Sequence, residues 1–226
     1  MREHGVRRWV RFRALLLVNL GLFALFLGGV LLTGHAHENE ELADHGQPAQ
    51  TLREYAGSSS FGETVFENWE SEFLQMFMYV LLTAYLVQKG SAESRPVDEA
   101  APQDEDPRDH RGDPEAPWPV RHGSALVLRL YENSLAIAFG LCFALSIWLH
   151  AVTGAGAYSE DQQLHGSQAV TTWQYVRTSQ FWFESFQNWQ SEFLAVAAII
   201  GGSVYLRQRS SSQSKPVHAP NAQTGD

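Results

Sequence analysis

Glu72 and Glu192 are the residues best suited to chemistry, because each lies beside or within a strongly apolar segment. They hold the same place in a repeated motif, FENWESEFL at residues 66–74 and FQNWQSEFL at residues 186–194. Leu206 follows Glu192 by 14 residues, which is about 21 Å of helix. Because a bilayer's hydrocarbon core is about 30 Å thick, an untilted helix would place this carboxylate inside it.

A carboxylate in the hydrocarbon core is unfavourable by roughly 2.5–3.5 kcal/mol unless it is protonated, paired or hydrated. One interpretation is a proton- or cation-handling pair, with Asn68 and Asn188 one helical turn away. The other, which we prefer at this point, places both glutamates at the membrane–water interface. There they would cap the start of a helix or form a hydrogen bond with a neighbouring helix.

The aromatic residues of the motif predict an interfacial belt. Trp69 and Trp189 each have a phenylalanine three residues before and four residues after them, which puts the rings on one helical face. Tryptophan is typical of the headgroup level of a membrane helix. We therefore expect no cofactor to bind there.

The histidines expected on the outer side of a membrane are His35, His37, His45, His150 and His165. A bis-histidine haem needs ligands at matched depth within the spans, and only His150 lies in a predicted span. His45 and His165 recur in the repeat, but a helix C-terminus favours histidine through its dipole alone. We expect no metal site.

Other classes of protein are disfavoured by composition and by missing motifs. The single cysteine, Cys142, lies in an apolar run and forms no CxxC pair. The sequence contains no GxSxG, HExxH or P-loop motif, so we expect no enzyme. A net charge of −9 argues against nucleic acid as a partner.

The glutamates must be positioned by helical spans, and the sequence contains four of them. We therefore predict an all-α fold, namely an integral membrane four-helix bundle. The predicted spans are residues 14–33, 66–87, 130–152 and 186–206. A cleaved signal peptide is the rival interpretation of the first span. The repeat argues against it, because the second copy keeps an equivalent span deep inside the chain.

The repeat divides the chain into two helical hairpins, residues 1–88 and 124–209. Shifting the chain by 120 residues aligns residues 33–97 with 153–217 without a gap, and 24 of these 65 pairs are identical. Each copy holds two spans, so the copies have the same orientation about an axis along the membrane normal.

Residues 89–123 read as an acidic linker, and residues 210–226 as a polar tail. Six of the nine prolines lie between Pro96 and Pro119, among many acidic residues. Such a segment has little to bury, so we expect the linker and the tail to be disordered.

The basic residues predict the orientation. With both termini in the cytoplasm, 14 of the 16 lysines and arginines lie on the cytoplasmic side. Only Arg53 and Arg177 lie in the two outer segments. We expect a multi-pass protein of the cytoplasmic membrane with the N-terminus, the linker and the C-terminus inside.

The motifs FENWESEFLQ, QKGSAES and FWFESFQNWQSEFL resemble an uncharacterised bacterial membrane-protein family, known only as a domain of unknown function. The resemblance covers nearly the whole chain outside the linker. It implies a four-span inner-membrane protein and supplies no activity.

We therefore expect a membrane protein with a structural or interaction role. The small residues Ala136, Gly140 and Ala144 are typical of close helix packing and offer a contact for a second copy or another membrane protein. The lipid bilayer is the other expected partner. The alternative is a small proton or cation transporter or channel that uses Glu72 and Glu192.

Overall fold

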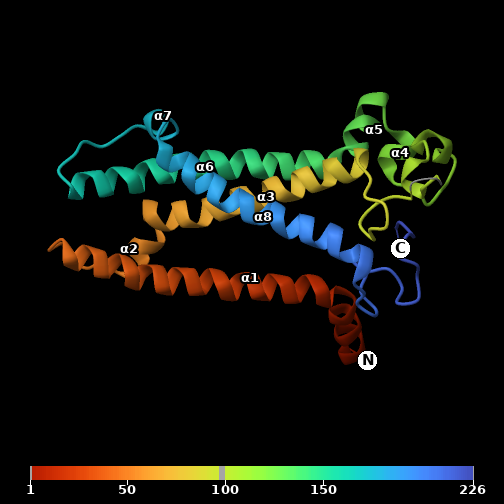
Figure 1. Ribbon diagram of the computed structural model, residues 1–226, viewed down its shortest axis with the longest axis horizontal. Helices are drawn as coiled ribbons and strands as arrows, with labels where there is room; N and C mark the ends of the chain where they lie inside the picture. The colour runs from red at the N-terminus through yellow and green to blue at the C-terminus, as the bar shows by residue number, and fades with distance from the viewer. Residues whose placement is uncertain (1, 97–99, 226) are drawn as a thin grey trace. The chain divides into compact units, whose positions relative to one another are not determined.

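The computed structural model describes residues 2–96 and 100–225; Met1, Asp226 and residues 97–99 of the predicted linker lie outside that description. The described residues form helices, turns and loops but no strand, which confirms the all-α fold class. The α-helices are α1 (Arg2–Asp44), α2 (Leu52–Ala56), α3 (Ser59–Tyr85), α4 (Trp118–His122), α5 (Ala125–Glu132), α6 (Ser134–Leu164), α7 (Thr172–Tyr175) and α8 (Ser179–Tyr205) (Figure 1).

Two of the described helical stretches are long and apolar enough to cross a membrane by length and composition: Val6–Asp44 in α1 and Ser134–Leu164, which is α6. The predicted third span does not lie in one helix. It begins in α5 and crosses a break at Asn133, whose side-chain amide donates to the carbonyl of Arg129 at 2.9 Å. Asparagine commonly competes with helical hydrogen bonds in this way. The four-span bundle stays a prediction.

The chain divides into two compact units. The first unit contains Met1–Val65 and Val152–Tyr175, and the second contains Phe66–Ala151 and Val176–Asp226. Each unit therefore draws residues from both copies of the repeat, and each is described by itself below.

In the first unit, both copies of the repeat make the same contacts. The side chain of Asn39 binds the backbone N–H and C=O of Gln50 at 2.7 and 3.1 Å. Ser159, the residue equivalent to Asn39, binds both backbone groups of Val170 at 3.0 and 3.2 Å. A polar side chain thus ties each long helix to the loop that follows it.

A tyrosine also packs on a glycine in each copy. A Cβ added to Gly34 would lie 2.1 Å from the hydroxyl oxygen of Tyr55, and one added to Gly154 would lie 2.5 Å from the ring of Tyr175. Both tyrosines are buried. Only glycine leaves room for these rings, which gives a physical reason for the identities seen at these positions.

A capping box formed by Thr51 and Glu54 begins α2. The backbone N–H and the hydroxyl of Thr51 both donate to the Glu54 carboxylate, at 2.7 and 2.8 Å. The backbone hydrogen bond from Thr51 is the main reason that the pKa of Glu54 lies below its ordinary value of 4.5.

The lowered pKa predicts how the stability of α2 depends on pH. Because the carboxylate is favoured in the folded state, its contribution is complete above pH 4.5 and is lost as the pH falls through the lowered pKa. Hydrogen-exchange protection of residues 51–56 should therefore fall in acid in the wild type. In Glu54→Gln this acid-dependent loss should be absent; an unchanged acid response in that variant would contradict the prediction.

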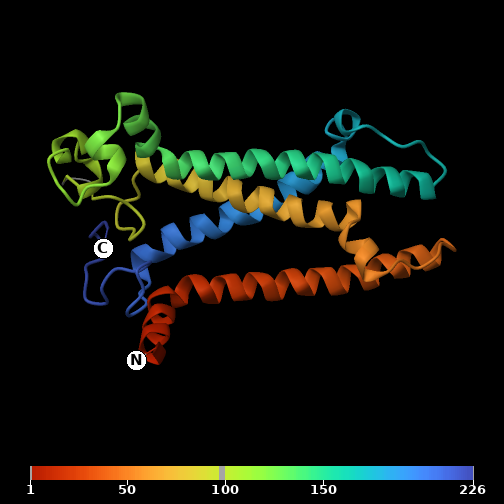
Figure 2. The same ribbon diagram turned by 180° about the vertical axis from the view of Figure 1, so that it is seen from behind.

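In the second unit, α3, α6 and α8 lie side by side in both views (Figures 1 and 2). A Cβ on Gly140 of α6 would lie 3.1 Å from the ring of Phe77 of α3. The Gln75 side chain of α3 donates to the backbone carbonyl of Glu192 of α8 at 2.9 Å. The rings of Phe143 and Trp189 join α6 to α8, with centroids 6.3 Å apart. Gly140 of the small-residue stripe therefore contacts another helix of the same chain.

The described part of the linker holds two 3₁₀ helices, Pro102–Asp104 and Pro107–His110, followed by α4. The tail folds around Lys215, which is buried. The Lys215 ammonium donates to the backbone carbonyls of Asn221 and Gln223, at 3.0 and 2.9 Å, and also to the backbone carbonyl of Gly90. The disorder expected for both segments stays a prediction.

The segments that follow α3 and α8 form the same turn. The N–H of Gln88 donates to the hydroxyl of Ser94, and the N–H of Gln208 donates to that of Ser214, each at 2.9 Å. Both turns contain a left-handed residue, Gly90 with φ 86° and Ser210 with φ 68°.

Replacing each of these two residues by the residue type of the other should change the free energy of unfolding in opposite directions. Gly90→Ser should lower the free energy of unfolding by about 1–3 kcal/mol, because its Cβ would lie 2.7 Å from the carbonyl oxygen of Asn221. Ser210→Gly removes the steric cost of a side chain in the left-handed conformation, so it should raise the free energy of unfolding by up to about 1 kcal/mol. Unfolding of the purified protein in detergent measures both, and equal losses in the two variants would contradict this account.

Candidate functional site

A fully buried pair of titratable side chains lies in the second unit. Glu70 of α3 and His150 of α6 both have no exposed surface, and Nδ1 of His150 lies 2.7 Å from Oε2 of Glu70. Charged side chains are rarely buried in full unless they are paired. Glu70 therefore differs in its burial from the chain's other acidic residues, most of which lie near the surface.

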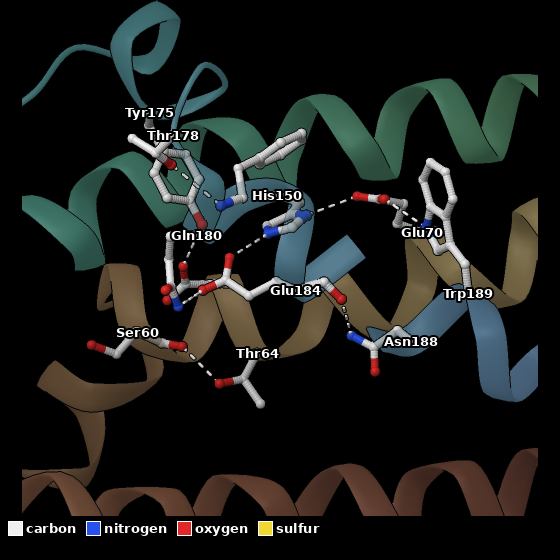
Figure 3. Close-up of polar contacts among 12 residues, drawn as sticks. Ser60, Thr64, Glu70, His150, Tyr175, Thr178, Gln180, Glu184, Asn188 and Trp189 are labelled. Atoms are coloured by element: carbon white, nitrogen blue, oxygen red, sulfur yellow. Dashed lines mark hydrogen bonds and ion pairs between the residues drawn. The ribbon is translucent and has the colours of Figure 1, made fainter. Parts of the chain in front are cut away.

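A second carboxylate, from α8, faces the other ring nitrogen of His150. Oε2 of Glu184 lies 3.4 Å from Nε2, and the Glu184 side chain keeps 16% of its surface exposed. Gln180, one helical turn before it, donates to Oε1 at 2.5 Å. Figure 3 shows the resulting line of contacts, which runs from exposed Gln180 through Glu184 and His150 to buried Glu70.

Aromatic side chains enclose the buried end of this line. The indole N–H of Trp189 donates to Oε1 of Glu70 at 2.9 Å. The ring of Phe181 stacks on the His150 ring, with centroids 4.8 Å apart and planes at 29°. Both oxygens of Glu70 thus have partners, and the imidazole is held between a carboxylate on each side and a ring on its face.

Hydrogen bonds on both sides of the His150 imidazole need a proton on each ring nitrogen or a proton on one of the carboxyl groups. Carboxylate oxygens only accept, and a neutral imidazole carries one N–H. If both contacts are hydrogen bonds, either the imidazole is doubly protonated or one glutamate carries a proton. A third carboxylate, that of Glu67, lies near enough to His150 for Coulomb attraction. The cluster of Glu70, His150 and Glu184, which we call the buried triad, can thus hold a proton at more than one place.

The glutamates singled out from the sequence lie outside the buried triad. Glu72 is exposed and Glu192 is half-buried, and their carboxylates lie near enough for Coulomb repulsion. Their roles stay predictions. Asn68 is exposed, and Trp69 is half-buried with its ring 5.7 Å from that of Phe66.

Two of the predicted residues lie at the triad. Trp189 binds Glu70, as described above, and the Asn188 amide donates to the backbone carbonyl of Glu184 at 3.2 Å. Trp189 therefore has a specific polar partner in addition to any part in an aromatic belt.

Sequence reasoning missed Glu70 and Glu184 because it searched for acidic residues that recur in the repeat. Gln190 stands where the second copy would match Glu70, and Thr64 where the first would match Glu184. His150 likewise has Val30 as its counterpart. One signal was present: each of these three ionisable residues has a counterpart in the other copy that is not ionisable, so the two copies differ in charge at all three positions.

The part of the chain that the structure describes is thus all-helical, with two helices long and apolar enough to cross a membrane and a buried carboxylate–imidazole cluster. A family model described as a domain of unknown function, DUF6766, matches residues 6–226. The chain belongs to this family, and the expectation of an uncharacterised family is confirmed. No curated protein and no solved structure matches the chain.

Proposed function

We propose that this chain is a four-span protein of the cytoplasmic membrane that handles protons at the buried triad. The observation that carries the proposal is the buried pair of Glu70 and His150, linked to the partly exposed Glu184. Ionisable residues in membrane spans are typical of proton and ion pathways. A buried ion pair is also weak evidence for a purely stabilising role, since an apolar replacement is often as stable.

The surface of α1 supports the membrane part of the proposal. None of its most apolar window is buried, and leucines such as Leu15 and Leu25 are mostly exposed. Lipid would cover these side chains. The distribution of the basic residues supports cytoplasmic termini, and the apolar parts of α3 and α8 supply the remaining two spans.

The depth of the triad favours proton entry from the outer side. Glu70 precedes Tyr85, the last residue of α3, by 15 residues, which is about 22 Å of helix. Glu184 precedes Tyr205, the last residue of α8, by 21 residues, or about 31 Å. With the inner boundary at these helix ends, Glu184 lies at the outer surface and Glu70 deeper, so a proton would pass inward through His150.

A structural role is the second candidate, and one observation favours it. Both carboxylate oxygens of Glu70 are occupied, by His150 and Trp189. The pair would then fix how α3, α6 and α8 pack.

Proton flux into liposomes separates these functions and also the two sets of glutamates. We would compare the wild type, Glu70→Gln and the double variant Glu72→Gln/Glu192→Gln, with an imposed pH gradient and a clamped voltage. The proposal expects flux in the wild type and at least a tenfold loss in Glu70→Gln. Loss in the double variant alone would place the proton site at Glu72 and Glu192. No flux in folded wild type would leave the structural role.

Labelling of single cysteines tests the topology separately. In a Cys142→Ser background, cysteines placed at Ser58 and Ser167 should react with a membrane-impermeant reagent added outside intact cells. Cysteines at Ser94 and Ser212 should react only after the cells are opened. The reverse pattern would contradict the orientation.

A further inference from the structure

We propose that His45 and His165 form a binding site for a divalent transition-metal ion such as Zn²⁺. Both histidines belong to the first unit and follow directly on the ends of the long helices α1 and α6. Their rings meet edge to face, with centroids 5.7 Å apart and planes at 73°. Two equivalent positions of the repeat thus bring two imidazoles together from residues 120 apart.

Hydrogen bonds fix which ring nitrogen is available to a metal. Nδ1 of His45 lies 2.9 Å from the carbonyl oxygen of Glu41, and Nδ1 of His165 lies 2.9 Å from that of Asp161. A carbonyl only accepts, so Nδ1 must carry the hydrogen in both rings. Nε2 of each neutral ring then keeps its lone pair. Metal-binding histidines are commonly oriented by such an N–H to carbonyl bond.

The turns that carry the two histidines are well defined and alike. Gly46 and Gly166 follow them in the left-handed conformation, with φ 67° and 77°. The N–H of Gln47 bonds to Leu42, and the N–H of Ser167 bonds to Gln162, each at 2.8 Å. The helix dipole explains a histidine at each end, but it does not explain why the two rings meet.

The spacing and the exposure suit a shared ion. Both side chains are exposed, and within the described part of the chain neither Nε2 has a hydrogen bond. Two imidazoles bound through Nε2 to one tetrahedral ion at about 2.0–2.1 Å place their ring centres roughly 5 Å apart, close to the separation found here. Imidazole suits zinc, copper and nickel, whereas calcium and magnesium prefer oxygen ligands. Water would complete the coordination.

Calorimetric titration of the untagged full chain in detergent with ZnCl₂ tests the site. We expect one ion per chain, and at least a tenfold weaker Kd in His45→Ala and in His165→Ala. His37→Ala, which changes another exposed histidine of the same segment, should bind as the wild type does. Excess CaCl₂ should not compete.

Copper supplies a second readout that does not depend on affinity. The paramagnetic resonance spectrum of the Cu²⁺-loaded chain should show coupling to two imidazole nitrogens, and to one in His165→Ala. Absence of zinc binding, or the same Kd and the same spectrum in His165→Ala, would overturn the proposal. Neither measurement uses proton flux, so failure of the metal site and failure of the proposed function can be told apart.

Discussion

Glu70→Ala should lower the free energy of unfolding by about 3–5 kcal/mol, the largest effect we expect from one substitution. The change leaves His150 in a fully buried position without its closest carboxylate, and it removes the acceptor of the Trp189 indole N–H. An unpaired buried charge is much less stable than a pair, and the cavity adds to the loss. Unfolding in a detergent titration measures the difference.

Glu72→Ala is the matched control, two residues further along the same helix. Glu72 is exposed, and substitutions at such positions usually change stability by no more than about 0.5 kcal/mol. Equal losses at both positions would contradict the burial of Glu70.

A double variant distinguishes the pair from its two members. Glu70→Gln and His150→Gln together remove both charges and retain groups that can hydrogen-bond. We expect the double variant to be more stable than the sum of the two single losses predicts, by about 0.5–3 kcal/mol of coupling. Additive losses would show that the two side chains do not interact.

Gly154→Val should lower the free energy of unfolding by about 1–3 kcal/mol. The new Cβ would lie 2.5 Å from Cε1 of Tyr175, whose side chain is completely buried. Its hydroxyl also donates to Glu63 at 2.9 Å, and a displaced ring would break that bond.

Gly201→Val provides the control for the change from glycine to valine within a helix. Gly201 also lies inside a long helix, and an added Cβ would meet nothing within 4 Å. Thermal unfolding of the two variants should differ clearly, with Gly154→Val the less stable. Similar midpoints would mean that the close approach of Tyr175 to α6 is wrong.

Much of the helical fold could be predicted from local patterns. The apolar runs predicted helices, and the structure contains long helices in all four places. The lengths could not be predicted, because α1 and α6 continue as helix through polar residues after their apolar runs end. Hydropathy locates the apolar part of such a helix and gives no signal for the rest.

The buried triad could not be predicted from the sequence because its members come from three helices. Glu70 and His150 are 80 residues apart, and His150 and Glu184 are 34 apart. The repeat favoured Glu72 because it recurs, yet Glu70, two residues earlier, is the buried one. A helix rotates by about 200° over two residues, so which of the two acids is buried depends on the packing of α3 against α6 and α8.

Infrared difference spectroscopy of the reconstituted protein tests the central claim most directly, because it detects protonation of single carboxyl groups. The spectrum would be recorded as the outer pH is lowered. We predict a band of a newly protonated carboxyl that disappears in Glu70→Gln or Glu184→Gln and remains in Glu72→Gln/Glu192→Gln. A band that persists in both triad variants and vanishes in the double variant would contradict proton handling at the buried triad.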